Sequence, residues 1–338
     1  MRVAGSLSRR QCIILPLFPI AAAVAALCIG RMSVSPGDLI NSLLAKFNSA
    51  IETSKQTEMV LWSIRLPRIL LALLVGAGLS ASGCAFQGLF ANPLATPDTL
   101  GVASGASFGA ALGLLMGMNL IGVQMMAMLM GVAAVALTYI SARQRGERQT
   151  NTVVLAGIMI GSLFSALVSL VKFVADTESQ LPAITYWLMG SLSSAGYDML
   201  KLGAPPILAG LVAMFLLRWR LNLLPLPEDE ARASGVNIAL LRGVTIVCAT
   251  MMTASCVSMC GQVGWVGLLI PHMCRMKFGN NNLSVMPASI TLGAGFMVLV
   301  DTFARSATAA EIPISILTAM IGAPFFIMLM RKSGGWRL

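Results

Sequence analysis

The feature that most constrains this chain is a series of apolar runs, each long enough for a helix to cross a lipid bilayer. A membrane-spanning helix needs about 20 consecutive apolar residues, and such runs recur from residue 13 almost to the C-terminus. They lack the alternation that the strands of a membrane β-barrel would show. Only 11% of the residues are charged, against about 25% in a typical soluble protein. The sequence therefore predicts an all-α polytopic membrane protein.

The apolar runs divide the chain into ten predicted transmembrane helices. Their expected positions are 13–31, 66–88, 97–117, 121–141, 152–173, 203–219, 240–260, 263–275, 284–304 and 311–331. We expect the first run to stay as an anchored span rather than be cleaved as a signal peptide, because the later spans need an anchored partner. The amphipathic segment between the first two spans is expected to rest a helix on the membrane surface. Residues 1–338 are thus expected to form a single transmembrane domain.

The distribution of basic residues predicts an orientation with both termini in the cytoplasm. Cytoplasmic segments then hold 15 of the 23 Lys and Arg residues but only 5 of the 13 acids, as the positive-inside rule requires. The predicted cytoplasmic cations are Arg2, Arg9, Arg10, Arg143, Arg145, Arg148, Arg218, Arg220, Arg232, Arg242, Arg275, Lys277, Arg331, Lys332 and Arg337. No basic stripe with interleaved aromatic residues occurs, so the net charge of +10 does not indicate nucleic-acid binding. Arg65 and Arg68 fall outside on this map, against the tendency of the rule.

The cysteines and methionines do not form a metal-binding pattern. All seven cysteines lie within or at the ends of apolar runs, no CxxC occurs, and His272 is the only histidine. Cys256 and Cys260 share one helix face, but metal sites need clustered His and Cys ligands. We interpret the cysteines as small packing residues and the 23 methionines as flexible apolar packing. No metal site and no cofactor are predicted.

The sequence contains no source of energy for transport. No GxxxxGK[ST] phosphate-binding loop occurs, so the chain is not expected to bind ATP alone or to act as an enzyme. Ion-coupled carriers place ionisable groups along the ion path, whereas here they lie near the ends of the predicted spans. These groups are Lys172, Asp301, Arg305 and Glu311. If the chain transports a substrate, a partner must supply the energy.

Small residues crowd several predicted spans, as in GAGLSASGCAFQG and TASCVSMCGQVGWVG. Because small residues let membrane helices approach closely, they predict a tightly packed bundle. The segments LSASGCAFQ (79–87) and MTASCVSMCGQ (252–262) also resemble each other across the two halves of the chain. This likeness suggests an inverted repeat, as found in many transporters.

Two long stretches carry a resemblance to a known family. They are RLPRILLALLVGAGLSASGCAFQGLFANPLATPDTLGVASGASFGAALG (65–113) and, within 261–329, GQVGWVGLLIPHMCRMKFG with DTFARSATAAEIPISILTAMIGAPFFIML. Together with YWLMGSL (186–192) and LAGI (155–158), they resemble the FecCD family, the permease subunits of bacterial ABC importers for iron-siderophores, haem and cobalamin. The resemblance implies a BtuC-like type II ABC importer permease with ten transmembrane helices.

The resemblance also implies partners and a substrate class. A second permease subunit, identical or similar, would form the translocation path on the dimer axis. Two cytoplasmic ATP-binding subunits would drive transport, and a periplasmic or lipid-anchored binding protein would deliver the substrate. The location implied is the bacterial cytoplasmic (inner) membrane. A ferric-siderophore is the first substrate expected, with haem, cobalamin and molybdate or tungstate as alternatives within the same architecture.

Two other classes of function remain open from the sequence. An ion-coupled secondary transporter would work without an ATPase, although the lack of intramembrane carboxylates counts against it. A non-transporting membrane scaffold would show no substrate-stimulated ATP hydrolysis when combined with an ATPase. Activity with and without the ATPase therefore separates these classes from an ABC permease.

One predicted contact with the ATPase is the segment LPLPEDEARASGVNIA (224–239), which resembles the coupling helices of the family. Pro227 can start a helix, three acids occupy its first turn where anions are favoured, and Gly235 can end it. The residues assigned to coupling are Glu228, Asp229, Glu230, Ala231 and Gly235. The chain departs from the family pattern at Pro227 and Ser234. It departs again at Asn280–Asn282, where the family often has an Asp-His pair. Charge-dependent contacts of that asparagine loop are therefore not carried over.

The resemblance assigns three further sets of residues. Thr150 and Asn151 precede the fifth span at the expected cytoplasmic gate, although they could equally cap the helix. Met159 and Leu163 are expected to line the path. The docking set for the binding protein is Arg65, Arg68 and Arg305. Arg65 and Arg68 flank Pro67 at a predicted helix start, where the helix dipole disfavours cations, so we expect their anionic partners on another protein.

Overall fold

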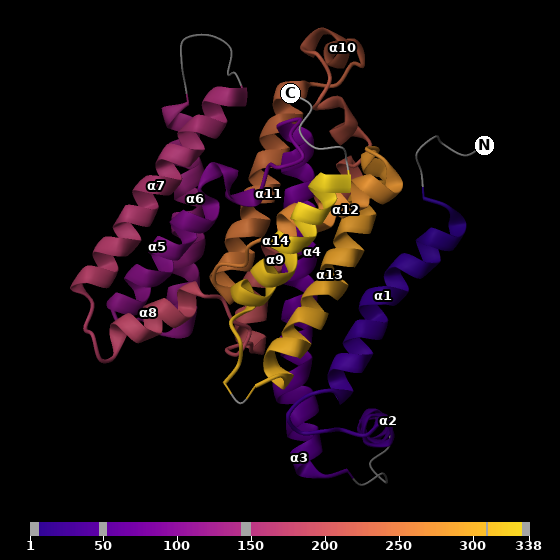
Figure 1. Cartoon of the computed structure of the whole chain (residues 1–338), viewed down its shortest axis with the longest axis vertical. Helices are drawn as coiled ribbons and strands as arrows, with labels where there is room; N and C mark the ends of the chain where they lie inside the picture. The colour runs from indigo at the N-terminus through magenta and orange to yellow at the C-terminus, as the bar shows by residue number, and fades with distance from the viewer. Residues whose placement is uncertain (1–6, 47–52, 143–149, 309, 333–338) are drawn as a thin grey trace.

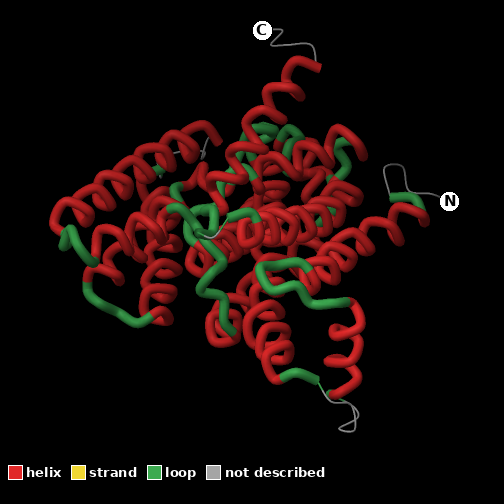
Figure 2. Tube along the Cα trace, turned by 60° about the horizontal axis from the view of Figure 1, so that its bottom comes forward, coloured by secondary structure: helices red, strands yellow, loops and turns green. Residues whose placement is uncertain are grey.

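The computed structural model describes residues 7–46, 53–142, 150–308 and 310–332. Every regular element among these residues is a helix (Figures 1 and 2). The longer helices are α1 (Arg9–Cys28), α4 (Leu66–Leu89), α5 (Val102–Leu115), α6 (Leu120–Ser141), α7 (Thr150–Val174), α9 (Tyr197–Leu217), α11 (Ile238–Cys260), α12 (Val266–Phe278), α13 (Asn282–Ser306) and α14 (Ile314–Lys332). The shorter ones are α2 (Pro36–Ala45), α3 (Lys55–Glu58), the π-helix η1 (Met59–Arg65), the 3-10 helices η2 (Pro97–Leu100) and η3 (Arg220–Leu223), α8 (Gln180–Leu188) and α10 (Glu228–Ala233).

A helix occupies the position of each of the ten predicted spans. Within the described residues, seven helices are long and apolar enough to cross a membrane: α1, the continuous helix of α3, η1 and α4, then α6, α7, α9, α11 and α13. Helices α5 and α14 are apolar but shorter, and α12 coincides with the eighth predicted span. The all-α multi-pass architecture is confirmed, and the number of crossings remains a prediction. Helices α2 and α3 confirm helical structure between the first two spans.

The bundle has two ends, which we name after helices found there (Figure 1). The α10 end also holds the start of α7 and the start of α13, and both the start of α1 and the finish of α14 lie toward it (Figure 1). The α3 end holds α2, α8 and the finish of α13 (Figure 1). Helices α4 and α13 each run from one end to the other, so a polar group at either end can be linked to the opposite end through them.

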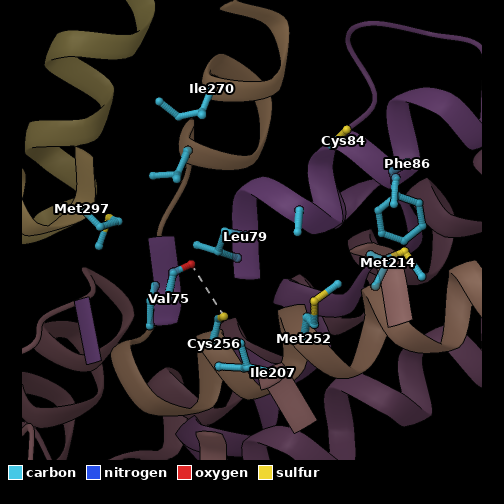
Figure 3. Close-up of a cluster of buried hydrophobic side chains, with 14 of the residues drawn as sticks. Val75, Leu79, Cys84, Phe86, Ile207, Met214, Met252, Cys256, Ile270 and Met297 are labelled. Atoms are coloured by element: carbon cyan, nitrogen blue, oxygen red, sulfur yellow. Dashed lines mark hydrogen bonds between the residues drawn. The ribbon is translucent and has the colours of Figure 1, made fainter. Parts of the chain in front are cut away.

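Helices α4 and α11 form the centre of the bundle. About 83% of the apolar stretch ending with α4 and 72% of that in α11 are buried, against 11% in α1, which lies at the periphery. The two similar segments identified in the sequence lie here and pack antiparallel. The Cys256 thiol lies 3.8 Å from the carbonyl oxygen of Val75 (Figure 3), and the Ser82 hydroxyl donates to the carbonyl of Ala249. This arrangement is the one an inverted repeat would produce.

The predicted role of small residues in close packing is confirmed by the glycines of α4. A Cβ atom added at Gly83 would lie 1.7 Å from the carbonyl oxygen of Gly267 in α12. A Cβ atom added at Gly76 would lie 2.2 Å from the carbonyl oxygen of Gly293 in α13. Because real Cβ atoms do not approach backbone so closely, only glycine allows these helices to touch. Helix α4 is therefore fastened along its length to α12 and α13.

The beginning of the second span differs from the prediction. The chain is already helical from Lys55, and the segment Met59–Arg65 is a π-helix that runs directly into α4. Pro67 has no N–H and its ring conflicts with a carbonyl one turn earlier, a conflict that a local π-helical segment can accommodate. Arg65 and Arg68 therefore lie inside a long helix. The argument that they sit at a helix start, opposed by its dipole, was wrong.

Candidate functional site

A cluster of charged side chains lies at the α3 end of the bundle, where three elements distant in sequence meet. We call it the arginine cluster: Arg65, Arg68, Asp301, Arg305 and Glu311. The first two come from η1 and α4, the next two from the last turns of α13, and Glu311 from the connection to α14. In the part of the chain that the structure describes, the four buried charged residues all belong to this cluster. The buried charges of the described residues are therefore concentrated at one site.

Arg68 is held by two carboxylates of the same chain. Its Nε and Nη2 donate to the Asp301 carboxylate at 2.8–3.1 Å, and its Nη1 and Nη2 donate to the two Glu311 oxygens at 3.0 and 2.9 Å. Planar pairing of this kind is strong and orientationally specific. Burial raises the pKa of Glu311, but the hydrogen bonds from Arg68 outweigh it and hold the pKa below its usual value. Arg305 Nε lies 3.7 Å from the Asp301 carboxylate.

Arg65 and Arg305 hold the end of α1. Arg65 donates to the carbonyl oxygens of Leu27 and Met32, and Arg305 donates to that of Ala26. The last carbonyl groups of a helix lack intrahelical partners and carry partial negative charge, so cations are favoured there. The two arginines therefore join the peripheral helix α1 to the central helices α4 and α13.

A cavity of about 330 Å3 opens beside the arginine cluster. It is lined by Arg31, Met32, Val60, Ile64, Arg65, Arg68, Arg305 and Glu311. Four guanidinium groups against one carboxylate make the lining positive. Arg31 is exposed at this site and donates to the carbonyl oxygen of Thr308 at 3.3 Å. The chemistry of the cavity suits an anionic group.

The structure brings together the three arginines that the resemblance assigned to docking, but it changes the role of Arg68. Its anionic partners are Asp301 and Glu311, so the inference that its charge requires a partner on another protein was wrong. Sequence reasoning noted these two carboxylates only as charges near span ends, because their pairing with Arg68 depends on the packing of α13 against α4. Arg31 was missed as a lining residue. Docking at this cavity stays a prediction.

The predicted coupling segment contains the expected short helix at the opposite end. Helix α10 begins after Pro227, whose carbonyl accepts from the Ala231 N–H at 3.0 Å. It ends before Gly235, which adopts a left-handed conformation with φ of 74°. Asp229 and Glu230 are exposed, whereas Ala231 is buried. The helix thus exposes acidic side chains and buries an apolar residue against its own chain.

The predicted pathway residues lie on α7. Met159 and Leu163 are 64% and 52% exposed on the surface of the chain. A second cavity, of about 440 Å3, lies beside the same helix and is lined by Asp98, Ser104, Gly157, Ile158, Gly161, Ser162 and Ser165. The serine hydroxyls of α7 donate to carbonyl groups one turn earlier, as at Ser162 and Ser165. Helix α7 therefore carries a mixed apolar and hydroxyl face that is exposed among the described residues.

Several predicted residues lie outside what the structure describes. Thr150 and Asn151 form the first turn of α7, but their side chains are not among the described groups, and neither is that of Glu228. The predicted basic loop 143–149 and Arg337 lie outside the described residues altogether. Among the described residues there is no group of three His, Cys, Asp or Glu side chains that could hold a metal ion.

The seven long apolar helices found among the described residues define a multi-pass membrane protein. The family model for the FecCD transport family matches residues 17–332. The molybdate import system permease protein MolB of Haemophilus influenzae is 43% identical over 94% of this chain and 94% of its own length. An iron chelatin transport system permease of Helicobacter pylori is 36% identical over 84% of this chain and 86% of its own.

A solved structure described as the inward-facing conformation of a metal-chelate type ABC transporter superposes with a TM-score of 0.87 and 41% identity. The match covers 96% of this chain and 100% of that one. The chain therefore belongs to the FecCD transport family, and it is a permease subunit of an ABC importer.

Proposed function

We propose that this chain forms the membrane path of an ATP-driven importer in the bacterial inner membrane. Two permease subunits would assemble with two cytoplasmic ATP-hydrolysing subunits and one substrate-binding protein outside. The observation that carries the proposal is the family match over residues 17–332 together with the likeness to a solved transporter. The chain itself would not hydrolyse ATP.

The two ends of the bundle support an orientation for this assembly. The α10 end would face the cytoplasm, where the exposed acids Asp229 and Glu230 would contact the ATPase. The α3 end would face outside, in agreement with the positive-inside rule that places both termini in the cytoplasm. Signals from ATP hydrolysis would then enter at α10 and reach the arginine cluster through helices that run between the two ends.

The cavity beside the arginine cluster would receive the binding protein. Arg31, Arg65 and Arg305 line it with positive charge, and an acidic side chain of the binding protein would complement them. Arg68 would hold the wall of the cavity through Asp301 and Glu311 rather than contact the partner directly. Complementary charge of this kind mainly raises the association rate and fixes the orientation of docking.

Helix α7 would line the path at the contact between two permease subunits. Its exposed side chains include Met159 and Leu163, and its serine hydroxyls lie beside the second cavity. The same face would remain unpartnered in an isolated chain, which agrees with its exposure. Thr150 and Asn151 would form the cytoplasmic gate at the start of this helix.

The substrate we propose is molybdate, and this replaces the ferric-siderophore that the sequence favoured first. The support is the molybdate permease of Haemophilus influenzae at 43% identity over 94% of both chains. A ferric chelate is the second candidate, supported by the Helicobacter pylori relative and by the metal-chelate type transporter structure.

Uptake into proteoliposomes tests the substrate. Vesicles containing the permease, the ATPase and the binding protein, with ATP inside, are given radiolabelled molybdate, a ferric-siderophore or cobalamin in turn. We expect accumulation of molybdate and no competition from a tenfold excess of cobalamin. Accumulation of the ferric chelate without molybdate would overturn the first candidate in favour of the second.

A further inference from the structure

The asparagine loop that departs from the family pattern has a specific set of contacts. Asn222, in η3 just before the coupling helix, donates from Nδ2 to the Asn281 side-chain oxygen at 2.9 Å. The Asn222 side-chain oxygen accepts from the backbone N–H of Asn282 at 2.8 Å. One side chain therefore connects the segment that carries α10 to the first residues of α13. We call these contacts the asparagine bridge.

Beyond the bridge, the contacts continue into the centre of the bundle. Asn282 is only 2% exposed, and its side-chain oxygen lies 3.5 Å from Nη2 of Arg275 in α12. Arg275 also donates from Nε to the Gln87 side chain at 3.2 Å and from Nη2 to the carbonyl oxygen of Cys84 at 3.1 Å. Gln87 returns a hydrogen bond from Nε2 to the carbonyl of Leu268 in α12. Polar groups thus join η3, α13, α12 and α4 at the α10 end.

The same two long helices are joined by charge at the other end. At the α10 end, Gln87 of α4 and Asn282 of α13 both contact Arg275. At the α3 end, Arg68 of α4 pairs directly with Asp301 of α13. Between these ends the helices touch at Gly76 and Gly293, where no larger residue fits. A pair of helices fastened at both ends and in close contact between them moves as one body, because packed interfaces do not deform continuously.

We propose that Asn222 is a positioning residue that couples movement of the α10 segment to α13 and α4, and through them to the arginine cluster. The inference rests on the proposed function, since it deepens the role of the coupling segment. Leu221 and Leu224 bury the same segment in the core, but the hydrophobic effect that holds them there is non-directional. The two hydrogen bonds of Asn222 fix its register against α13.

Neutral amides suit this position better than a charged pair would. An amide both donates and accepts, so Asn222 satisfies an acceptor and a buried backbone donor at once. Asn281 also caps α13 by accepting from the Leu283 N–H at 3.0 Å. Loss of the Asn222 side chain would remove the acceptor that the backbone N–H of Asn282 has in this bridge, and an unsatisfied buried donor is costly. The asparagines therefore form a hydrogen-bonded contact inside the chain.

Asn222→Ala in the full complex tests the inference, with Asn119→Ala as the matched control. Asn119 is an exposed asparagine outside the coupling segment, and its side chain caps α6 by accepting from the Gly122 N–H at 2.8 Å. The measurement is the amount of substrate accumulated per ATP hydrolysed, using whichever probe wild-type vesicles accumulate, molybdate or a ferric chelate. We expect the ratio to fall about fivefold or more for Asn222→Ala, and to stay at the wild-type value for Asn119→Ala.

A second pair of variants separates coupling from folding. Asn281→Asp keeps the oxygen that accepts from Asn222 and caps α13, so we expect it to retain most of the coupling ratio. Asn281→Ala removes that oxygen, so we expect its accumulation of substrate per ATP hydrolysed to fall as it does for Asn222→Ala. Both Asn281 variants should still bind the ATPase. A wild-type ratio in Asn222→Ala would overturn the inference, and so would equal ratios in the two Asn281 variants. A wild-type complex that accumulates neither probe would contradict the proposed function instead.

Discussion

Arg68 is the side chain on which the α3 end of the bundle depends most. Both of its carboxylate partners lie more than 230 residues away in sequence, and the Asp301 side chain is 2% exposed. Asp301→Asn keeps the shape of this side chain and removes its charge, leaving a buried guanidinium partly uncompensated. We expect a loss of about 3–5 kcal/mol in the free energy of unfolding, measured by thermal unfolding of the detergent-solubilised permease.

Asp198→Asn is the matched control for this prediction. Asp198 pairs with Lys201 at 2.9 Å, nearly the distance of the buried pair, but both side chains are more than three-quarters exposed. Exposed pairs contribute about 0–1 kcal/mol, so the unfolding temperature should hardly change. If the two variants lost equal stability, burial would not explain the contribution of the arginine cluster to the free energy of unfolding.

Arg31 tests docking because it is the exposed arginine of the positive cavity. It is exposed and lines the positive cavity, so Arg31→Glu should slow association of the binding protein by about tenfold at low salt, with a smaller effect at high salt. Surface plasmon resonance with the permease in nanodiscs measures this rate. Lys201→Glu changes the same charge on another exposed site, and an equal effect from it would show that the cavity is not the docking site.

The sequence placed the three arginines of the cluster together through family resemblance, but it could not identify what they contact. Arg65 and Arg305 bind the last carbonyl groups of α1, and no sequence pattern encodes such a contact with backbone. The pairing of Arg68 with Asp301 and Glu311 follows from the packing of α4 on α13. Only the four-residue spacing of Asp301 and Arg305 was visible as a local signal.

At the scale of helices, the close contact of α4 with α12 provides a further prediction. Gly83→Ala would place a methyl group against the backbone of Gly267, and backbone cannot move aside as a flexible side chain can. The expected loss of stability is about 1–3 kcal/mol or more. Thermal unfolding and the yield of monodisperse protein in size-exclusion chromatography report it.

Gly243→Ala in α11 is the control for that prediction. A Cβ atom at Gly243 meets nothing within 4 Å, and alanine favours a helix over glycine by up to about 1 kcal/mol. We therefore expect this variant to be at least as stable as the wild type. A loss of stability in Gly243→Ala matching that in Gly83→Ala would contradict the account of helix contact.

Helix positions were predicted well because hydrophobic length determines them, whereas irregular elements were not. Each predicted span has its helix, and the small-residue segments of α4 and α11 do lie at the centre of the bundle. The π-helical entry to α4 was missed, since its cause is the conflict of Pro67 with the preceding turn inside a continuous helix. The short α8 lies in a connection that hydropathy does not resolve, and the 3-10 helix η2 occupies the start of the third predicted span, where a continuous helix was expected.

At the scale of the whole molecule, the proposed assembly divides the path between two permease subunits. The face of α7 with Met159 and Leu163 is exposed in the described part of the chain, and in the proposed dimer a second subunit would cover it. Residues that select the substrate would accordingly come from both subunits, whereas the family match shows the class of transporter.

The driving force of uptake tests the central claim most directly. Proteoliposomes containing the permease, the ATPase and the binding protein are given radiolabelled molybdate or ferric chelate with ATP inside, and the same vesicles are given an imposed proton or sodium gradient without ATP. The account predicts accumulation with ATP and none with either gradient, and no accumulation when the ATPase is omitted. Accumulation driven by a gradient in vesicles that lack the ATPase would contradict it and would identify an ion-coupled carrier.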